Sequence, residues 1–293
     1  MDVEEWYHNC CIEEYVRPER RPPLLDELDR LLPELLDLIE QLPARATLFV
    51  LGEVAERVPA RIREARDRGH EIACHGYLHL RANDRSAGEF RRDLQRAKGL
   101  LEDLTGDPVR GFRAPEWSLR SPANPRLRIV AECGFDYDSS LVAAIGSGSS
   151  ENPEGLTRFL WPDGLTLLEL PPLVWAGPLR LPAGGWCGRL AHPRWLRGAL
   201  EVAREGRGSP IVVVHPWEVV DRAVPGVLTG LGRFFHEAAR KGYRERFVET
   251  YADLGFSTLA ELYATCLRRL SAEPVAAAPA TGPQIFAPAA ARR

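Results

Sequence analysis

The sequence predicts an α/β fold with parallel strands, because short apolar runs alternate with amphipathic helical segments along most of the chain. Two of the runs, 47–51 and 71–74, are apolar enough to be buried strands. Helical segments stop at glycines such as Gly69 and Gly134, which favour the left-handed backbone of a helix end. The 293 residues are enough for one barrel of roughly 200–250 residues with additional segments.

Each expected element has its own local pattern. Strands are expected where aliphatic and β-branched residues form a short run, at 47–51, 71–74, 109–113, 166–170 and 210–215, with a strand end at 256. Helices are expected at 24–42, 86–104, 125–133 and 193–204. A further helix is expected from Val54 through Ala65 to Gly69, and a last helix follows the strand end at 256 and stops at 270. Pro33 marks a start or a kink of the first helix. Residues 271–293 are mostly Ala and Pro, so we expect a disordered tail.

Charge and hydropathy exclude two classes of function. The chain has 38 Lys and Arg against 41 Asp and Glu, a formal net charge of −3, which disfavours non-specific nucleic-acid binding. Apolar stretches such as 211–214 are far too short for a membrane span. The start Met1–Glu5 has no signal-peptide pattern, and none of the six cysteines forms a CxxC pair. We therefore expect a cytoplasmic protein with reduced thiols.

The most specific local signal is the pair His75 and His79, which follows an expected strand. Two histidines four residues apart can bind one metal ion, and α/β barrels place catalytic groups after the carboxyl ends of strands. Imidazole is a ligand for zinc, cobalt, nickel and iron. Surface or structural histidines nevertheless explain most pairs with this spacing alone.

Carboxylates open the chain at Asp2, Glu4 and Glu5. In a strand, alternation places Asp2 and Glu4 on the same face, where one could bind a metal and the other accept a proton from water. A solvated acidic end is the simpler interpretation of this segment taken alone.

Two further segments end strands with polar groups. Arg113 begins Arg-Ala-Pro-Glu-Trp, and its guanidinium could orient a carboxylate while Glu116 and Trp117 border a sugar site. His215 follows the apolar run 211–214 and could protonate a leaving amine. A structural ion pair and a structural histidine are the alternatives. The sequence has no GxSxG or Walker A motif.

Taken in order, these motifs resemble the polysaccharide deacetylases of the NodB-homology superfamily, carbohydrate esterase family 4. The exosortase-associated, exopolysaccharide-locus branch is the most similar. The matching segments are Asp2-Val3-Glu4-Glu5-Trp6-Tyr7-His8, 46–52, 69–79, 109–115, 134–140 and 215–218. The family's GGGYFR loop appears here in altered form at 183–189, with Trp186 as its aromatic residue.

The resemblance implies a deformed (β/α) barrel with a C-terminal extension. We expect the barrel at 1–220, the extension packed on it at 221–270, and the tail at 271–293. It implies a metal-dependent hydrolase that removes N-acetyl groups from a glycan in exopolysaccharide biosynthesis. The divalent metal would be zinc first, with cobalt, nickel or iron also compatible.

The resemblance also implies a role for individual residues. Asp2 matches the catalytic base, Arg113 the residue that orients it, and His215 the general acid. Glu4, His75 and His79 match the metal ligands, with Glu4 preferred to Glu5 because it shares the face of Asp2. Substrate contacts are expected from Glu116, Trp117, Trp186 and Trp217. His8 and His236 match recurrent positions, and we expect structural or rim duties for them.

Two other functions stay open, as does the oligomeric state. The same scaffold could hydrolyse a small amide, as allantoinase-like relatives do, or the chain could be an inactive glycan-binding relative. Family members have several apolar residues before the DVE motif. The first strand is therefore expected to be truncated here, unless the chain starts further upstream.

Overall fold

The computed structural model describes residues 1–8, 27–144, 148–175, 180–205, 210–220, 230–270 and 283–286. Its centre is an eight-stranded sheet with the strand order β1-β2-β3-β4-β5-β7-β6-β8. The pairs from β1 to β7 are parallel, and β6 pairs antiparallel with both β7 and β8. The expected α/β class with parallel strands is confirmed.

The strands are short, and most follow the expected apolar runs. Their bounds are β1 Asp2–Val3, β2 Thr47–Val50, β3 Glu71–Cys74, β4 Gly111–Phe112, β5 Tyr137–Asp138, β6 Thr157–Leu160, β7 Thr166–Glu169 and β8 Gln284–Phe286. The first strand, β1, is two residues long, as are β4 and β5. The sequence analysis did not identify β5 or β6.

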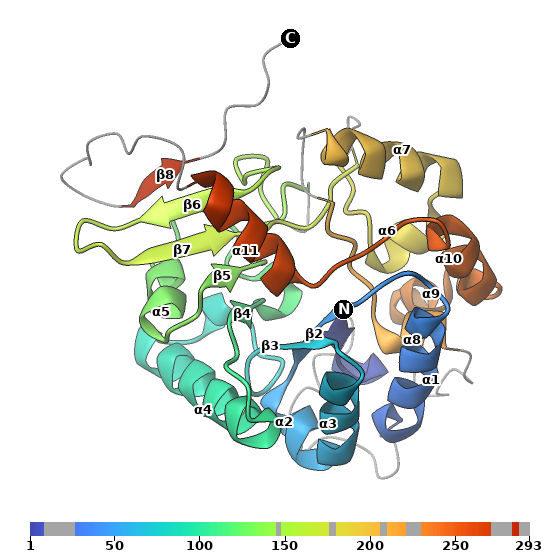
Figure 1. The fold of residues 1–293 in the computed structure, drawn as a ribbon, viewed down its shortest axis with the longest axis horizontal. Coiled ribbons are helices and arrows are strands. Elements are labelled where there is room, and N and C mark those ends of the chain that lie inside the picture. The colour runs from blue at the N-terminus through green and yellow to red at the C-terminus, as the bar shows by residue number, and fades with distance from the viewer. Residues whose placement is uncertain are drawn as a thin grey trace.

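Helices surround the sheet on its outer side (Figure 1). Their bounds are α1 Leu28–Glu40, α2 Gly52–Arg57, α3 Pro59–Asp67, α4 Ala87–Thr105, α5 Arg126–Glu132, α6 Gly185–Leu190, α7 Pro193–Arg204, α8 Pro216–Val219, α9 Gly230–Glu237, α10 Tyr243–Tyr251 and α11 Leu259–Leu270. Pro33 lies inside α1. A capping box between Ser86 and Glu89 begins α4, and Gly106 in the left-handed conformation ends it.

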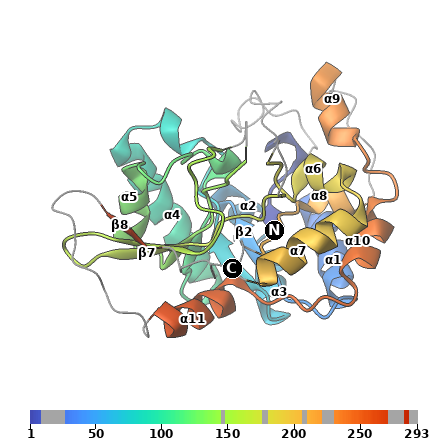
Figure 2. The same ribbon diagram turned by 90° about the horizontal axis from the view of Figure 1, so that it is seen from above.

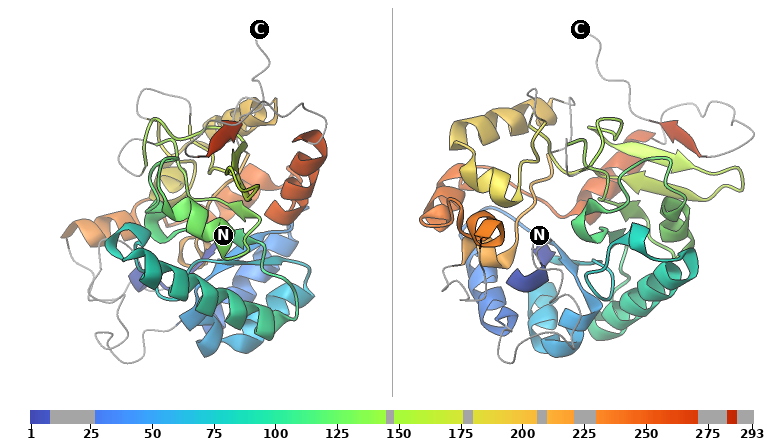
Figure 3. Two further views of the ribbon diagram at one scale, coloured as in Figure 1. Left: turned by 90° about the vertical axis from the view of Figure 1, so that its left-hand side faces the viewer. Right: turned by 180° about the vertical axis from the view of Figure 1, so that it is seen from behind.

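Alternation along the strands separates two apolar layers. Leu48 and Val50 of β2 belong to the large cluster under the helices, whereas Phe49 packs with Ala73 and Tyr137 in a second cluster on the inner face. Asp2 is the register partner of Phe49, so it also lies on the inner face. The curved, helix-covered sheet is visible from above and from the side and back (Figure 2, Figure 3).

Three expectations about local structure were wrong. One helix was expected from Val54 to Gly69, but α2 and α3 are separate. Pro59 has no N–H to donate and disfavours a helical backbone at Val58, whose φ and ψ are −125° and 52°. The segment 210–215 is not a ladder strand, and its bridge is the isolated pair between Gly184 and Val213. Residue 256 likewise makes only an isolated bridge, to Ala44.

The C-terminal part of the chain packs against the sheet and its helices. Tyr243, Phe247 and Tyr251 of α10 are buried, and α10 contacts α7 and α8. Within the tail that was expected to be disordered, β8 pairs with β6, because Ile285 and Phe286 supply two residues that favour strands. The remaining tail residues, 271–282 and 287–293, lie outside the described residues, as do Cys10 and Cys11.

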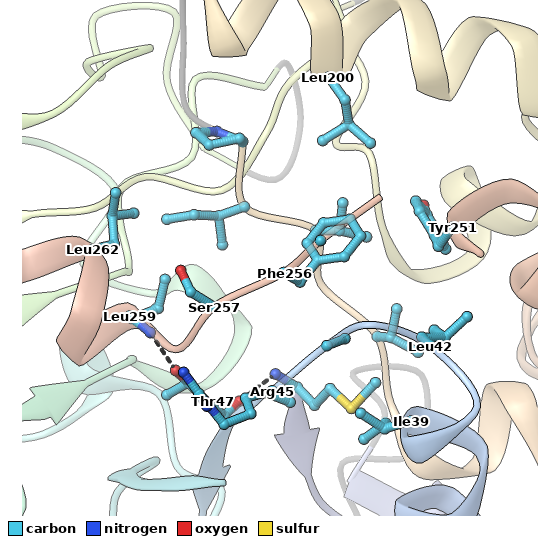
Figure 4. A pocket seen from close by; sticks show the side chains of 18 of the residues that line it. Ile39, Leu42, Arg45, Thr47, Leu200, Tyr251, Phe256, Ser257, Leu259 and Leu262 are labelled. Atoms are coloured by element: carbon cyan, nitrogen blue, oxygen red, sulfur yellow. Dashed lines mark hydrogen bonds between the residues drawn. The ribbon is translucent and has the colours of Figure 1, made fainter. Parts of the chain in front are cut away.

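A cavity of about 190 Å³ lies near the amino ends of the strands (Figure 4). The Met1 ammonium donates to the Thr47 carbonyl oxygen at 2.7 Å, and the Leu259 N–H donates to Thr47 Oγ1 at 2.7 Å. The lining is mainly apolar, with Leu42, Leu200 and others around it. None of the described residues lining it is His, Cys, Asp or Glu.

Candidate active site

Asp2 and Arg113 form a buried ion pair on the inner face of the sheet. Arg113 Nη1 lies 2.5 Å from Asp2 Oδ1, and the two side chains are 1% and 6% exposed. Burial acts to raise the pKa of Asp2, but the Arg113 guanidinium and neighbouring histidines outweigh it and lower that pKa to about 2. Asp2 is therefore an ionised carboxylate held in one orientation.

Glu4, His75 and His79 come together immediately beyond the strands β1 and β3. Glu4 Oε2 lies 2.7 Å from His79 Nε2 and 3.8 Å from His75 Nε2. One ligand atom from each residue lies within 4.8 Å of the other two, and all three residues are buried. The sequence expectation that these three residues converge agrees with this geometry.

The donor set fits a divalent metal ion. His75 Nδ1 lies 2.8 Å from the Arg113 carbonyl oxygen, to which it can only donate, and Nε2 lies on the side of Glu4. Two imidazole nitrogens and one carboxylate are a set that zinc and similar metals use, and three protein ligands leave coordination positions open. These residues could therefore hold a metal with access to substrate.

Glu4 and Glu5 have different partners, although they are neighbours in sequence. Glu5 Oε1 accepts hydrogen bonds from the backbone N–H groups of Glu27 and Leu28, at 2.8 and 3.0 Å, where helix α1 begins. A carboxylate at this place satisfies free N–H groups and interacts favourably with the helix dipole. Glu5 thus caps a helix, and Glu4 faces the histidines.

His215 lies across the same site from His75. Its Nε2 is 3.4 Å from Glu4 Oε1 and 4.0 Å from Asp2 Oδ2, and its Nδ1 is 2.8 Å from Glu218 Oε2. Burial acts to lower the pKa of His215, but the Glu218 carboxylate, followed by Glu4 and Asp2, raises it to about 9. The sequence analysis gave Glu218 no role, although its position three residues after His215 is the spacing of a capping box.

Glu218 in turn pairs with Arg189. Arg189 Nε lies 2.9 Å from Glu218 Oε1, and both side chains are 1% exposed. The same guanidinium donates to the carbonyl oxygens of Phe235 and His236, at 2.6 and 2.7 Å. His215 is therefore supported by a buried chain of interactions that reaches helix α9.

Trp217 lies between two histidine rings. Its ring stacks on His215 at 5.2 Å and on His236 at 4.7 Å, with interplanar angles of 22° and 21°. It is 4% exposed and borders the cavity of the site, so it supports His215 more than it offers a surface to substrate. His236 is fully buried, as the expectation of a structural duty implies.

An open cavity of about 400 Å³ lies over these groups. Its described lining comprises Asp2, Glu4, His8, His75, His79, Arg81, Ala114, Glu116, Trp117, Arg120, Pro182, Gly184, Gly185, Trp186, Arg189, His215, Trp217 and Phe235. Trp186 is 41% exposed and packs against Phe235 at 5.0 Å. Glu116 pairs with Arg81 at 2.5 Å. Aromatic faces and polar groups of this kind suit a sugar ring.

The rim of this cavity has an unusual backbone. Glu116, Trp117 and Arg120 have φ values of 54°, 49° and 60°, in the left-handed region that non-glycine residues rarely adopt. Residues held in this way concentrate at functional sites, since the surrounding structure must offset the strain.

His8 lies against His79. His8 Nε2 lies 3.0 Å from Glu53 Oε1, and its ring stacks on His79 at 5.4 Å. The sequence analysis left its role open between structure and rim, and it both borders the cavity and packs on His79. Glu53 was not identified from the sequence, because only the fold brings it to His8.

Known proteins are similar to part of this chain. Residues 25–137 match the family model described as polysaccharide deacetylase. A peptidoglycan deacetylase of Helicobacter pylori is 32% identical over 111 residues, which are 38% of this chain and 37% of that protein. A chitooligosaccharide deacetylase of Azorhizobium caulinodans is 33% identical over 91 residues, 30% of this chain and 43% of that protein. Each match covers less than half of the relative's length.

Solved structures resemble the whole fold. A Mycobacterium smegmatis protein assigned as a polysaccharide deacetylase superimposes with a TM-score of 0.57 at 24% identity, covering 86% of this chain and 81% of its own. The Puue allantoinase gives a TM-score of 0.55 at 18% identity, with 90% and 87% covered. The fold is therefore the deformed barrel of the NodB type. The segment matched to polysaccharide deacetylases contains His75, His79 and Arg113.

None of the helices in the described part of the chain is long and apolar enough to cross a membrane.

Proposed function

We propose that this protein is a metal-dependent deacetylase that hydrolyses N-acetyl groups on a polysaccharide. The observation that carries the proposal is the convergence of Asp2, Glu4, His75, His79 and His215 beneath one aromatic-lined cavity of about 400 Å³. Carboxylate, imidazole and a metal site are what amide hydrolysis near neutral pH requires. The similarity to polysaccharide deacetylases supports the same activity.

Each residue has a separate task in this proposal. Glu4, His75 and His79 would hold a divalent ion, zinc first, with cobalt, nickel or iron also compatible. When bound, the metal supplies Lewis acidity that lowers the pKa of water and polarises the acetyl carbonyl. Asp2, aimed by Arg113, accepts the proton of the attacking water.

His215 then protonates the departing amine, with Glu218 orienting its ring through Nδ1. A backbone N–H near Glu116 would stabilise the oxyanion, which the left-handed conformation of this turn supports. The products are acetate and a free amino sugar. Trp117 and Trp186, with Glu116, would contact the glycan, and Trp217 would act through His215.

The biological role is proposed from the sequence motifs alone. Their resemblance to the exosortase-associated branch supports a part in exopolysaccharide biosynthesis. The domain division at 220 and 270 is proposed on the same basis.

Hydrolysis of a small amide is the competing function, because the fold is also similar to that of an allantoinase. Against an inactive glycan-binding protein, we note that Asp2, Glu4, His75, His79 and His215 all line one cavity. Acetate release from acetylated glucosamine polymers, with allantoin hydrolysis measured in parallel, separates the two activities.

The deciding experiment combines metal analysis with acetate release. We expect about one metal ion per chain, and loss of both metal and activity in His75→Ala. His192→Ala is the matched control, since His192 is an exposed residue at the start of α7. Full activity of His75→Ala, or of metal-free protein, would contradict the proposal.

A further inference from the structure

Two carboxyl groups lie side by side in the interior, away from the proposed metal ligands. Asp138 of β5 and Glu169 of β7 are direct partners in the parallel ladder, and both are fully buried. Each has one oxygen, Oδ2 of Asp138 and Oε2 of Glu169, with no hydrogen-bond donor among the described residues. Neighbouring strands lie about 4.8 Å apart and register partners point to the same face, so the two carboxyl groups are neighbours. Two neighbouring buried carboxylates cannot both be charged, so the pair requires one proton.

The remaining contacts show which carboxyl is the better anion. Asp138 Oδ1 accepts from Ser140 Oγ at 2.6 Å, the length typical of a hydroxyl that donates to an ionised carboxylate. Glu169 Oε1 accepts from the Leu141 N–H at 3.0 Å, the length of an ordinary N–H bond. The shorter bond stabilises a negative charge on Asp138, so the proton belongs on Glu169. Burial, followed by the facing Asp138 charge, holds the pKa of Glu169 well above its usual range.

The turn that begins at Asp138 supports the side chain of Arg113. Arg113 donates to the Ser139 carbonyl oxygen through Nε at 3.0 Å and to Ser139 Oγ through Nη2 at 2.8 Å. Ser139 Oγ donates onward to the Leu170 carbonyl oxygen at 2.6 Å. The third arm of the guanidinium, Nη1, is the one that binds Asp2. The orientation of Asp2 therefore depends on the turn that begins at Asp138.

We propose that Glu169 is a positioning residue that carries the single proton of this pair and, by donating it to Asp138, holds the turn on which Arg113 rests. Glu169 affects catalysis through Arg113, which orients Asp2. This effect on catalysis rests on the proposed function. Arg113, which directly follows β4, is a charged residue near the pair and acts against the raised pKa of Glu169.

The first test compares Glu169→Gln with Glu169→Leu. Glutamine can donate to Asp138 and accept from Leu141, and it leaves the pair with the same single negative charge. Glu169→Gln should therefore retain kcat within about twofold, whereas Glu169→Leu should lose roughly 10–100-fold in kcat with little change in KM, as displaced supporting residues do. Equal losses in both variants would overturn the proposal.

Asp138→Asn tests which residue holds the proton. Asparagine cannot supply the anion that the Ser140 hydroxyl binds, so this variant should lose activity as Glu169→Leu does. If Asp138→Asn is tolerated and Glu169→Gln is not, the proton belongs to Asp138 and our assignment is wrong.

A third test needs no substrate, so it stands even if the proposed function fails. In the unfolded chain, Glu169 loses its proton above its ordinary pKa of 4.5. In the folded protein the raised pKa lets Glu169 keep this proton to higher pH. The wild type should therefore lose stability as pH rises from about 4.5 toward the folded pKa, and Glu169→Gln should not. The thermal midpoints of the two proteins should agree near pH 5, and the variant should become increasingly the more stable toward pH 9.

Glu151→Gln is the matched control, because Glu151 is exposed and the same substitution there should leave the midpoint–pH curve of the wild type unchanged. Parallel curves for the wild type and Glu169→Gln would show that no shared proton exists and would overturn the proposal.

Discussion

Arg113 and Asp2 form an ion pair across 111 positions of the chain, with Nη1 and Oδ1 2.5 Å apart in the interior. Asp2 begins strand β1, and Arg113 directly follows strand β4 of the parallel sheet. A buried carboxylate is costly to desolvate, and the guanidinium offsets that cost. The pair therefore joins the first strand to the middle of the sheet and fixes the proposed base in one position.

Asp2→Asn should lower kcat about 10²- to 10⁴-fold, because the amide keeps the shape of the side chain and cannot accept the proton of water. The measurement is acetate release at saturating substrate, with metal content determined on the same samples. Asp2 is not among the three converging ligand residues, so the metal content should be kept. A kcat within twofold of the wild type would remove Asp2 from the chemistry.

Glu5→Gln also replaces a carboxylate with an amide, three residues away, but it should lower stability and leave kcat unchanged. Glu5 caps the start of α1, so the loss of its charge should cost about 1 kcal/mol in the free energy of unfolding. The kcat of the folded protein should stay close to that of the wild type. Urea unfolding and acetate release measure the two effects, and a large loss of kcat with intact stability would show that Glu5, rather than Glu4, serves the site.

Arg113→Met should destabilise the protein by roughly 3–5 kcal/mol, because it leaves the Asp2 carboxylate buried without a cation. Combining it with Asp2→Asn removes the stranded charge, so the double variant should be more stable than Arg113→Met alone. A double-mutant cycle from urea unfolding gives the coupling free energy. Simple additivity of the two single changes would mean that the ion pair contributes nothing.

His70 gives a pH dependence of stability that is independent of the active site. His70 Nδ1 accepts from the Ala46 N–H at 3.1 Å, next to the start of β2, and burial lowers the pKa of His70 below 6.5. A histidine with a lowered folded pKa stabilises the fold above 6.5, and this stabilisation is lost as pH falls toward the folded pKa.

His70→Asn keeps an acceptor for the same N–H and cannot be protonated. The wild type should therefore lose stability relative to this variant as the pH is lowered from 7.5 to 5, measured by thermal unfolding. A constant difference between the two midpoints over this range would contradict the assigned protonation.

The local sequence pattern was sufficient for elements whose signals are also local. β3 was expected at 71–74 and is Glu71–Cys74, and α7 was expected at 193–204 and is Pro193–Arg204. An apolar run and a proline at the helix start define these elements without help from distant residues. The break between α2 and α3 was missed, although the Val58–Pro59 pair is a local signal for it.

The residues of the candidate site also differ in whether a local pattern identifies them. His75 and His79 could be singled out from their spacing, and alternation placed Asp2 and Glu4 on one face. Glu53 and Arg189 were given no role, since their partners lie on other elements and are reached only after folding. Glu218 was also given no role, although its position three residues after His215 is a local signal. Asp138 and Glu169 escaped notice for the same reason, because nothing in either segment predicts that β5 and β7 are neighbours.

The sequence by itself determined the α/β class, the order of the motifs and the residue types that chemistry would need, because periodicity and spacing are properties of short segments. The tertiary structure decided which carboxylate faces the histidines and which caps a helix, and it decided where Arg113 and His215 point. These outcomes depend on strand register and on the burial of charge. Both arise only when residues far apart in the chain share the same interior, where an unpaired charge is too costly to keep.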